Sequence, residues 1–187
     1  MERFIAASDE ELAADLNNCP ENLAILINRY QAPLSRYIFR LSGLTKEDIE
    51  DILQLVFFKL YRNINNFDPE LKFSTWLYRI AHNETISHHR RKMSRPNIDY
   101  NLDDNTFNSL AGSDWQQVAN NAIWRTQLNQ AIDSLPEKYR QVIILRYFED
   151  LDYQTIAEII QQPAGTVATF LNRGKQQLLK FLTKKYE

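Results

Sequence analysis

The chain has 187 residues, of which 44% are hydrophobic and 25% charged, and its formal net charge at pH 7 is −2. This is the composition of a folded chain with one domain or two small ones, and its four glycines and six prolines are too few for a β-rich fold with many tight turns. The single cysteine, Cys19, excludes an internal disulfide and a multi-cysteine zinc site.

Targeting signals are absent from the sequence. The N-terminus is acidic and lacks the apolar segment of a signal peptide. No apolar run approaches the length that a membrane span needs. We therefore predict a cytoplasmic protein in which this chain makes no membrane insertion.

Charge is distributed unevenly along the chain. Residues 1–21 carry one arginine against six acids, a net charge of −5. Residues 84–95 carry four basic residues against one acid (+3), and residues 164–187 carry five against one (+4). Two separate basic segments fit a two-point contact with a polyanion better than they fit uniform, non-specific binding.

Helical periodicity dominates the first half of the sequence. The spacing predicts helices over about residues 8–16, 21–41, 46–63 and 74–92. Ser8 and Glu11 form a predicted capping box, and Thr45 is the predicted N-cap of the third helix. Pro33 lies inside the second helix, where we expect it to distort the backbone. The segment "NNFDPELK" before the fourth helix is a predicted loop.

Residues 94–114 interrupt the helical pattern. They are rich in Ser, Asn, Asp, Gly and Pro, and we interpret them as a flexible, acidic interdomain linker. Helices are then predicted from Trp115 to Ser134, from Pro136, over "LDYQTIAEII" and from Pro163 to about Lys184. The predicted fold is all-α, with two small helical domains at residues 1–93 and 115–187.

Residues 153–184 have the proportions of a helix-turn-helix. On the longer helix, the residues predicted to pack inward are Val167, Leu171, Gly174 and Leu178. The opposite face is expected to enter the major groove of DNA, with free N–H groups of Gly165 and Thr166 near a phosphate. The residues predicted to contact DNA are Thr166, Ala168, Thr169, Asn172, Arg173 and Lys175.

The residue types on that face are suited to reading bases. Arg173 could contact guanine through two hydrogen bonds and Asn172 could do the same with adenine, while Ala168 or Thr169 could touch a thymine methyl group. A helical hairpin with a solvated polar face is the alternative.

The fourth helix combines aromatic and basic side chains. Trp76 and Tyr78 could stack on unpaired bases, and Asn83 could read a base edge. The basic residues predicted to contact the DNA backbone are Arg79, Arg90, Arg91 and Lys92. Packing in the core is the alternative for Trp76, and a solvated helix end is the alternative for the basic run. The three histidines have no suitably spaced acidic or cysteine partners, so we predict no metal site.

Two sets of motifs resemble one protein family. The segments "LPEKYR", "LRYFEDLDYQTIAEI" and "P-x-G-T-V" are similar to region 4 of sigma-70 family factors of the extracytoplasmic-function (ECF) group. The segments "DILQLVF" and "FSTWLYRIAHN" are similar to region 2 of the same group. The resemblance covers about residues 8–93 and 115–185, with departures at Leu55, Ala168, Phe170 and Gly174.

This resemblance implies an alternative sigma factor with several partners. Asp51, Gln54 and Phe57 would contact core RNA polymerase, the first domain would recognise and melt the −10 promoter element, and the second would bind the −35 element. The resemblance also implies an anti-sigma factor as partner, and neither a cofactor nor a catalytic site. The alternatives are a helix-turn-helix regulator that acts without polymerase, and a helical protein-interaction module.

Overall fold

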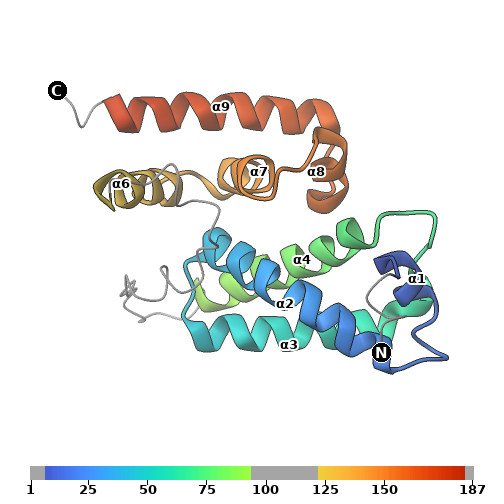
Figure 1. The fold of residues 1–187 in the computed structure, drawn as a ribbon. Coiled ribbons are helices and arrows are strands. Elements are labelled where there is room, and N and C mark those ends of the chain that lie inside the picture. The colour runs from blue at the N-terminus through green and yellow to red at the C-terminus, as the bar shows by residue number, and fades with distance from the viewer. Residues whose placement is uncertain (1–6, 94–121, 184–187) are drawn as a thin grey trace. The chain divides into compact units, whose positions relative to one another are not determined.

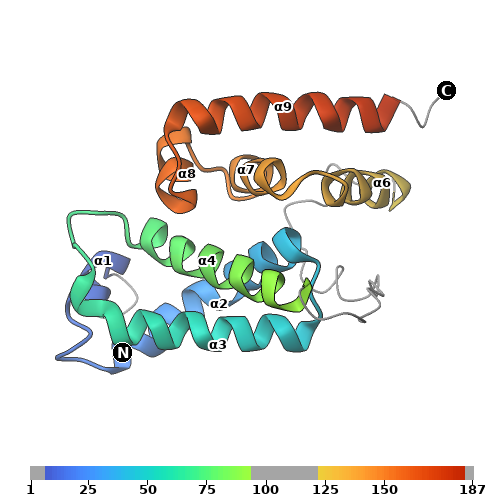
Figure 2. The same cartoon turned by 180° about the vertical axis from the view of Figure 1, so that it is seen from behind.

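A computed structural model describes residues 7–93 and 122–183 of the chain (Figures 1 and 2). The chain divides into two compact units, Met1–Leu102 and Asp103–Glu187, and each is described by itself. Within the described residues all regular elements are helices, which confirms the predicted all-α fold. The predicted linker at residues 94–114 and the start of the helix predicted from Trp115 lie outside the described residues.

Among the described residues, the first unit contains four α-helices and one short 3-10 helix. They are α1 (Asp9–Ala14), α2 (Glu21–Ser42), α3 (Lys46–Asn63), η2 (Ile64–Asn66) and α4 (Phe73–Met93). Helices α2, α3 and α4 pack on one another, and α1 contacts α2 and α4. In both views α1 lies beside the loop that joins the end of α3 to the start of α4 (Figures 1 and 2).

The helix ends of the first unit follow local sequence signals. The capping box is confirmed, because Ser8 and Glu11 each bond to the other's backbone N–H. Thr45 caps α3 by accepting a hydrogen bond from the N–H of Asp48. Helix α2 runs through Pro33 without a break, and it ends at Gly43, which has a φ of 61°. This left-handed conformation suits glycine because it has no Cβ.

The core of the first unit contains a buried histidine. A hydrogen bond of 2.9 Å joins Nδ1 of His82 on α4 to the hydroxyl of Tyr37 on α2. Burial, together with the positive charge of Arg90, lowers the pKa of His82 to about 4. The ring of Tyr37 also packs against that of Tyr78, with centroids 5.2 Å apart. His82 is therefore held neutral between two helices.

This histidine predicts an acid-sensitive first unit. The pKa of His82 rises from about 4 in the folded chain to about 6.5 on unfolding. The contribution of neutral His82 to the free energy of unfolding is therefore fully present above pH 6.5 and is lost as the pH falls towards 4. The total loss is about 3 kcal/mol. Urea unfolding at pH 7 and pH 4.5 measures it. His82→Asn does not titrate, so its loss of stability between these pH values should be smaller; an equal loss would contradict the prediction.

Within residues 122–183, the second unit contains four helices. They are α6 (Ala122–Asp133), α7 (Glu137–Tyr147), α8 (Tyr153–Ile160) and α9 (Ala164–Thr183). Helix α9 packs along α6 and α7, and α8 lies at its N-terminal end (Figures 1 and 2). Pro136 and Pro163 each precede the first helical residue, so α7 and α9 begin one residue later than predicted.

Gly174 lies at the contact between α9 and α7. The side chains of Val167 and Leu171 are buried on the same face of α9, as the sequence pattern predicts, and Leu178 is half-buried. A Cβ placed on Gly174 would lie 3.1 Å from Cγ1 of Ile143 and 3.4 Å from Cβ of Tyr139. The absent side chain thus permits the close approach that holds α9 in place. No helix within the described ranges is long and apolar enough to cross a membrane.

Candidate functional site

A tight turn joins α8 to α9. Asp152 caps α8 by accepting a hydrogen bond of 2.8 Å from the N–H of Thr155. Helix α8 ends at Gln161, which adopts a left-handed conformation with a φ of 54°. Pro163 follows after Gln162, and its carbonyl accepts hydrogen bonds from the N–H groups of Thr166 and Val167. A short helix, a left-handed residue and a proline-led helix make a helix-turn-helix.

The outward face of α9 is polar and accessible. The side chains of Thr169, Asn172 and Arg173 are exposed, and Ala168 is half-exposed. Among the described residues, the guanidinium of Arg173 has no hydrogen-bond or ion-pair partner. The hydroxyl of Thr169 donates to the carbonyl of Gly165 at 2.9 Å, so the side chain offers a partner an acceptor and a methyl group. Four of the predicted contact residues therefore share one free face.

One prediction about α9 needs revision. The N–H of Thr166 is not free, because it donates to the carbonyl of Pro163 at 2.8 Å, and only its half-exposed side chain is available to DNA. Phe170, which departs from the family pattern, packs against Tyr139 with ring centroids 5.8 Å apart. Its side chain extends the packing face and does not lie among the DNA-facing residues.

Basic and aromatic side chains flank this face, and most of them were not predicted from the sequence. The ammonium of Lys175 lies 5.4 Å from the ring centre of Tyr147, and a hydrogen bond to that residue raises the pKa of Lys175. The guanidinium of Arg146 lies 5.9 Å from the ring centre of Tyr153. Arg146 also donates to the carbonyl of Leu151. The sequence signal for Arg146, Tyr147 and Tyr153 was the basic and aromatic residues of "LRYFEDLDY", which were interpreted only as a family motif.

On α4, one stripe of residues faces outward. Trp76, Asn83 and Arg90 recur at intervals of seven residues, which places them on one side of the helix. Asn83, Arg90 and Arg91 are exposed, and Arg79 is half-exposed beside them. This stripe combines an aromatic surface, an amide and positive charge along one helix.

Trp76 packs at the edge of the core and keeps part of its side chain exposed. Its ring packs near Phe67 and Phe73, with centroids 5.4 and 6.1 Å apart, yet the side chain is half-exposed. Tyr78 differs, because it is only 8% exposed and its ring packs on Tyr37. The prediction that Tyr78 stacks on a base is wrong, since two residues along a helix turn the side chain to nearly the opposite face.

Helix α3 presents a mixed polar and apolar surface. Asp51 and Gln54 are exposed as expected, but Phe57 is only 9% exposed and packs in the core. The next residue, Phe58, is 55% exposed and lies seven residues from Asp51, on the same side of the helix. The prediction that Phe57 offers a contact surface is therefore wrong. The large exposed apolar side chains of α3 are those of Leu55, Phe58 and Tyr61.

Two helical units, one with a helix-turn-helix, define the class of this protein. The family model for Sigma-70 region 2 matches residues 26–95, and that for Sigma-70, region 4 matches residues 125–178. The ECF RNA polymerase sigma factor SigW of Bacillus subtilis is 36% identical over 85% of this chain and 88% of its own length. The ECF RNA polymerase sigma-E factor of Haemophilus influenzae is 32% identical over 82% and 84%.

Two solved structures share the fold. CnrH, in complex with the cytosolic domain of CnrY, has a TM-score of 0.71 at 19% identity, covering 94% of this chain and 97% of CnrH. The sigma factor RpoE of Bartonella quintana, in complex with the anti-sigma factor NepR, has a TM-score of 0.69 at 18% identity, covering 87% and 98%. The chain belongs to the extracytoplasmic-function group of the sigma-70 family and is an alternative sigma factor that directs transcription.

Proposed function

We propose that this chain binds core RNA polymerase and places α9 on the −35 promoter element and α4 on the −10 element. The observation that carries the proposal is the pair of outward faces: each combines an exposed asparagine with exposed arginine, and they lie in separate units of one chain. Asparagine and arginine are side chains that read base edges and neutralise phosphates. A regulator acting without polymerase is not favoured, because it leaves the region 2 match unexplained.

At the −35 element, Asn172 and Arg173 make the base contacts. They follow the buried Leu171 on a helix fixed by packing against α7, so their position relative to the unit is set by the core. Ala168 and the methyl group of Thr169 supply apolar contacts to thymine. Thr166 and the flanking basic side chains Arg146 and Lys175 contact the phosphates on either side.

At the −10 element, α4 holds an unpaired base. The half-exposed ring of Trp76, supported from behind by Phe67 and Phe73, is a stacking surface that loses little entropy on binding. Asn83 lies two turns further along the same side and reads a base edge. Arg79, Arg90 and Arg91 hold the strand through its phosphates.

Polymerase binds along α3. Asp51 and Gln54 supply polar contacts, and Leu55, Phe58 and Tyr61 supply apolar area on the same exposed helix surface. An exposed aromatic residue between polar ones is the composition of a protein-binding surface. Leu55 stands where the ECF group usually has an acid, so this surface relies more on apolar contact.

An anti-sigma factor is the proposed regulator of this chain. Two proteins with the same fold are described in complexes with CnrY and with an anti-sigma factor, which supports this partner. The chain itself is proposed to act by binding and not as an enzyme. The proposed localisation is the bacterial cytoplasm, where promoter DNA and polymerase are found.

A run-off transcription assay with core polymerase tests the function. We expect transcripts from a start site that core polymerase alone does not use, on templates chosen by mapping start sites after overexpression. The α4 variant Asn83→Ala should lower this transcript, while Glu158→Ala, which removes an exposed side chain of α8, serves as the control. Failure of the wild-type chain to give any promoter-specific transcript would refute the proposal.

A further inference from the structure

The loop between η2 and α4 (residues 67–72) is held by contacts within the loop and by contacts from other parts of the first unit. Residues 68–72 are exposed, and the ring of Phe67 is buried against those of Phe73 and Trp76. Within the loop, Asp68 forms a turn by accepting hydrogen bonds from the N–H groups of Glu70 and Leu71. These bonds shape the loop but do not fix it to the rest of the unit.

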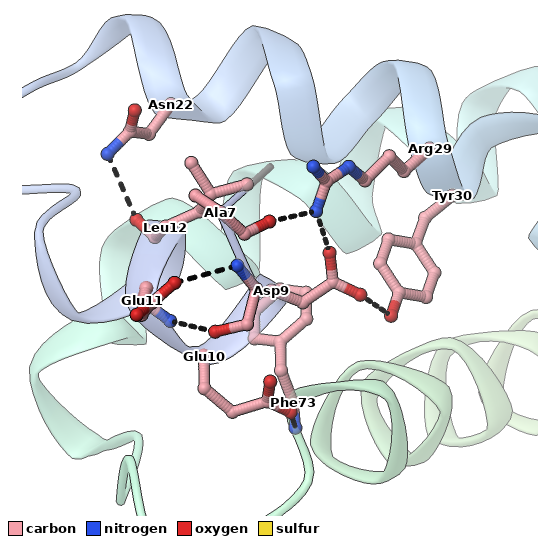
Figure 3. Close-up of polar contacts among 10 residues, drawn as sticks. Ala7, Asp9, Glu10, Glu11, Leu12, Asn22, Arg29, Tyr30 and Phe73 are labelled. Carbon is pink, nitrogen blue, oxygen red and sulfur yellow. Dashed lines mark hydrogen bonds and ion pairs between the residues drawn. The ribbon is translucent and has the colours of Figure 1, made fainter. Parts of the chain in front are cut away.

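Glu10 fixes the end of the loop that leads into α4. Its carboxylate accepts a hydrogen bond of 2.8 Å from the backbone N–H of Phe73, the first residue of α4 (Figure 3). The residue before Phe73 is Lys72, whose side chain has donors only and cannot cap the helix. A carboxylate from α1 thus supplies the acceptor, at a helix end where negative charge is favoured.

Asn17 fixes the other end of the loop. Its side-chain amide donates to Oδ1 of Asn65 in η2 at 2.6 Å. Asn17 follows α1 closely, and Asn65 lies in η2, two residues before the loop begins. The N-terminal segment therefore holds both ends of the loop, through side chains that lie 48 and 63 residues away in sequence from their partners.

Helix α1 is itself firmly attached to α2. Asp9 accepts hydrogen bonds from Arg29 and from the hydroxyl of Tyr30, and Asn22 donates to the carbonyl of Leu12 at 3.3 Å (Figure 3). The ring of Tyr30 also meets that of Phe73 edge to face, with centroids 5.6 Å apart. A helix tied to α2 on one side can hold a loop on its other side.

The acidic character of the N-terminal segment fits this role. Residues 1–21 have a net charge of −5, which excludes them from the phosphate backbone. In the structure, Asp9, Glu10 and Glu11 each accept hydrogen bonds within the unit. Glu10 bonds to the start of α4, whereas Asp9 bonds to α2 and Glu11 to the start of α1.

We propose that α1 positions the loop at residues 67–72 and the start of α4 for capture of the −10 strand, with Glu10 and Asn17 as positioning residues. The proposal rests on the proposed function, because it assumes that α4 binds this strand. Loss of either hydrogen bond frees one end of the loop, and Trp76 at the start of α4 then loses its fixed orientation.

The test uses holoenzyme assembled from core polymerase and the full chain. The measured quantity is the affinity for a single-stranded oligonucleotide that carries the −10 sequence, with affinity for a double-stranded −35 fragment as reference. We expect Glu10→Ala to weaken −10 strand binding about five- to tenfold, the effect of losing one helix cap. Glu10→Gln keeps an acceptor oxygen and should stay within about twofold of the wild type.

Two further variants separate positioning from folding and from charge. Asn17→Ala leaves the cap on Phe73 intact and should weaken −10 strand binding without changing −35 binding. Glu50→Ala removes an exposed acid whose ion pair is with Lys46 on the same helix, and it should change neither affinity. A global folding defect would lower both affinities together, and that result would overturn the proposal.

The remaining outcomes are equally distinct. Transcription by the wild type together with unchanged −10 strand binding in Glu10→Ala and Asn17→Ala overturns the positioning role alone. Equal loss in Glu10→Gln and Glu10→Ala also overturns it, because the acceptor would then not matter. If the wild type gives no promoter-specific transcript, the proposed function fails and takes this proposal with it.

Discussion

Replacing Arg173 with alanine is expected to weaken promoter binding by the holoenzyme by about 1–3 kcal/mol, or roughly 5- to 150-fold. The guanidinium is exposed and has no partner within the described residues, so its removal leaves no buried group unsatisfied in the free protein. Its loss should therefore act on binding and leave the unfolding free energy within about 0.5 kcal/mol of the wild type. Titration of labelled promoter fragments with holoenzyme measures the effect.

The comparison with a scrambled −35 element makes this result specific. On a fragment with an intact −10 element and a scrambled −35 element, wild type and Arg173→Ala should bind equally. Glu158→Ala is the control, since Glu158 is exposed on α8 and is not among the residues proposed to contact DNA. An effect of Arg173→Ala that persists on the scrambled element would show a general phosphate contact and not base reading.

Local signals made the helices predictable. Ser8 with Glu11, and Thr45 with its first-turn N–H, act within three residues, so a reader of the sequence has all the partners in view. Apolar spacing located the packing face of α9 because Val167, Leu171 and Gly174 follow the helical period closely. The site residues on α9 then followed as the face opposite to this stripe.

Predictions from the sequence failed where two aromatic residues lie close together in the chain. They also missed contacts between residues that are distant in sequence. By residue type, either Phe57 or Phe58 could lie in the core or on a contact surface. The rotation of α3 about its axis as it packs on α2 and α4 decides that Phe57 is buried and Phe58 exposed. Tyr78 was placed with Trp76 by residue type, although a helix turns them to different faces. The bond from Phe73 to Glu10 spans 63 residues and leaves no local pattern to read.

The two neighbouring phenylalanines of α3 should respond oppositely to truncation. Phe58→Ala removes an exposed ring that contacts only the guanidinium of Arg62, 5.6 Å away, among the described aromatic and ion contacts. We expect its unfolding free energy to change by less than about 0.5 kcal/mol. Its affinity for core polymerase should fall by about 2 kcal/mol or more, close to 30-fold, because an aromatic anchor contributes much of a protein interface.

Phe57→Ala should show the reverse pattern, because the loss of a buried ring costs about 3–5 kcal/mol of stability. At temperatures where this variant stays folded, its affinity for core polymerase should match the wild type. Urea unfolding and a competition assay for core polymerase separate the two effects, with Leu179→Ala as a control at an exposed apolar site of the second unit. Equal polymerase affinity for Phe58→Ala and wild type would exclude this face of α3 as the docking surface. The pair therefore decides whether the ring that binds polymerase is the one that the fold leaves exposed.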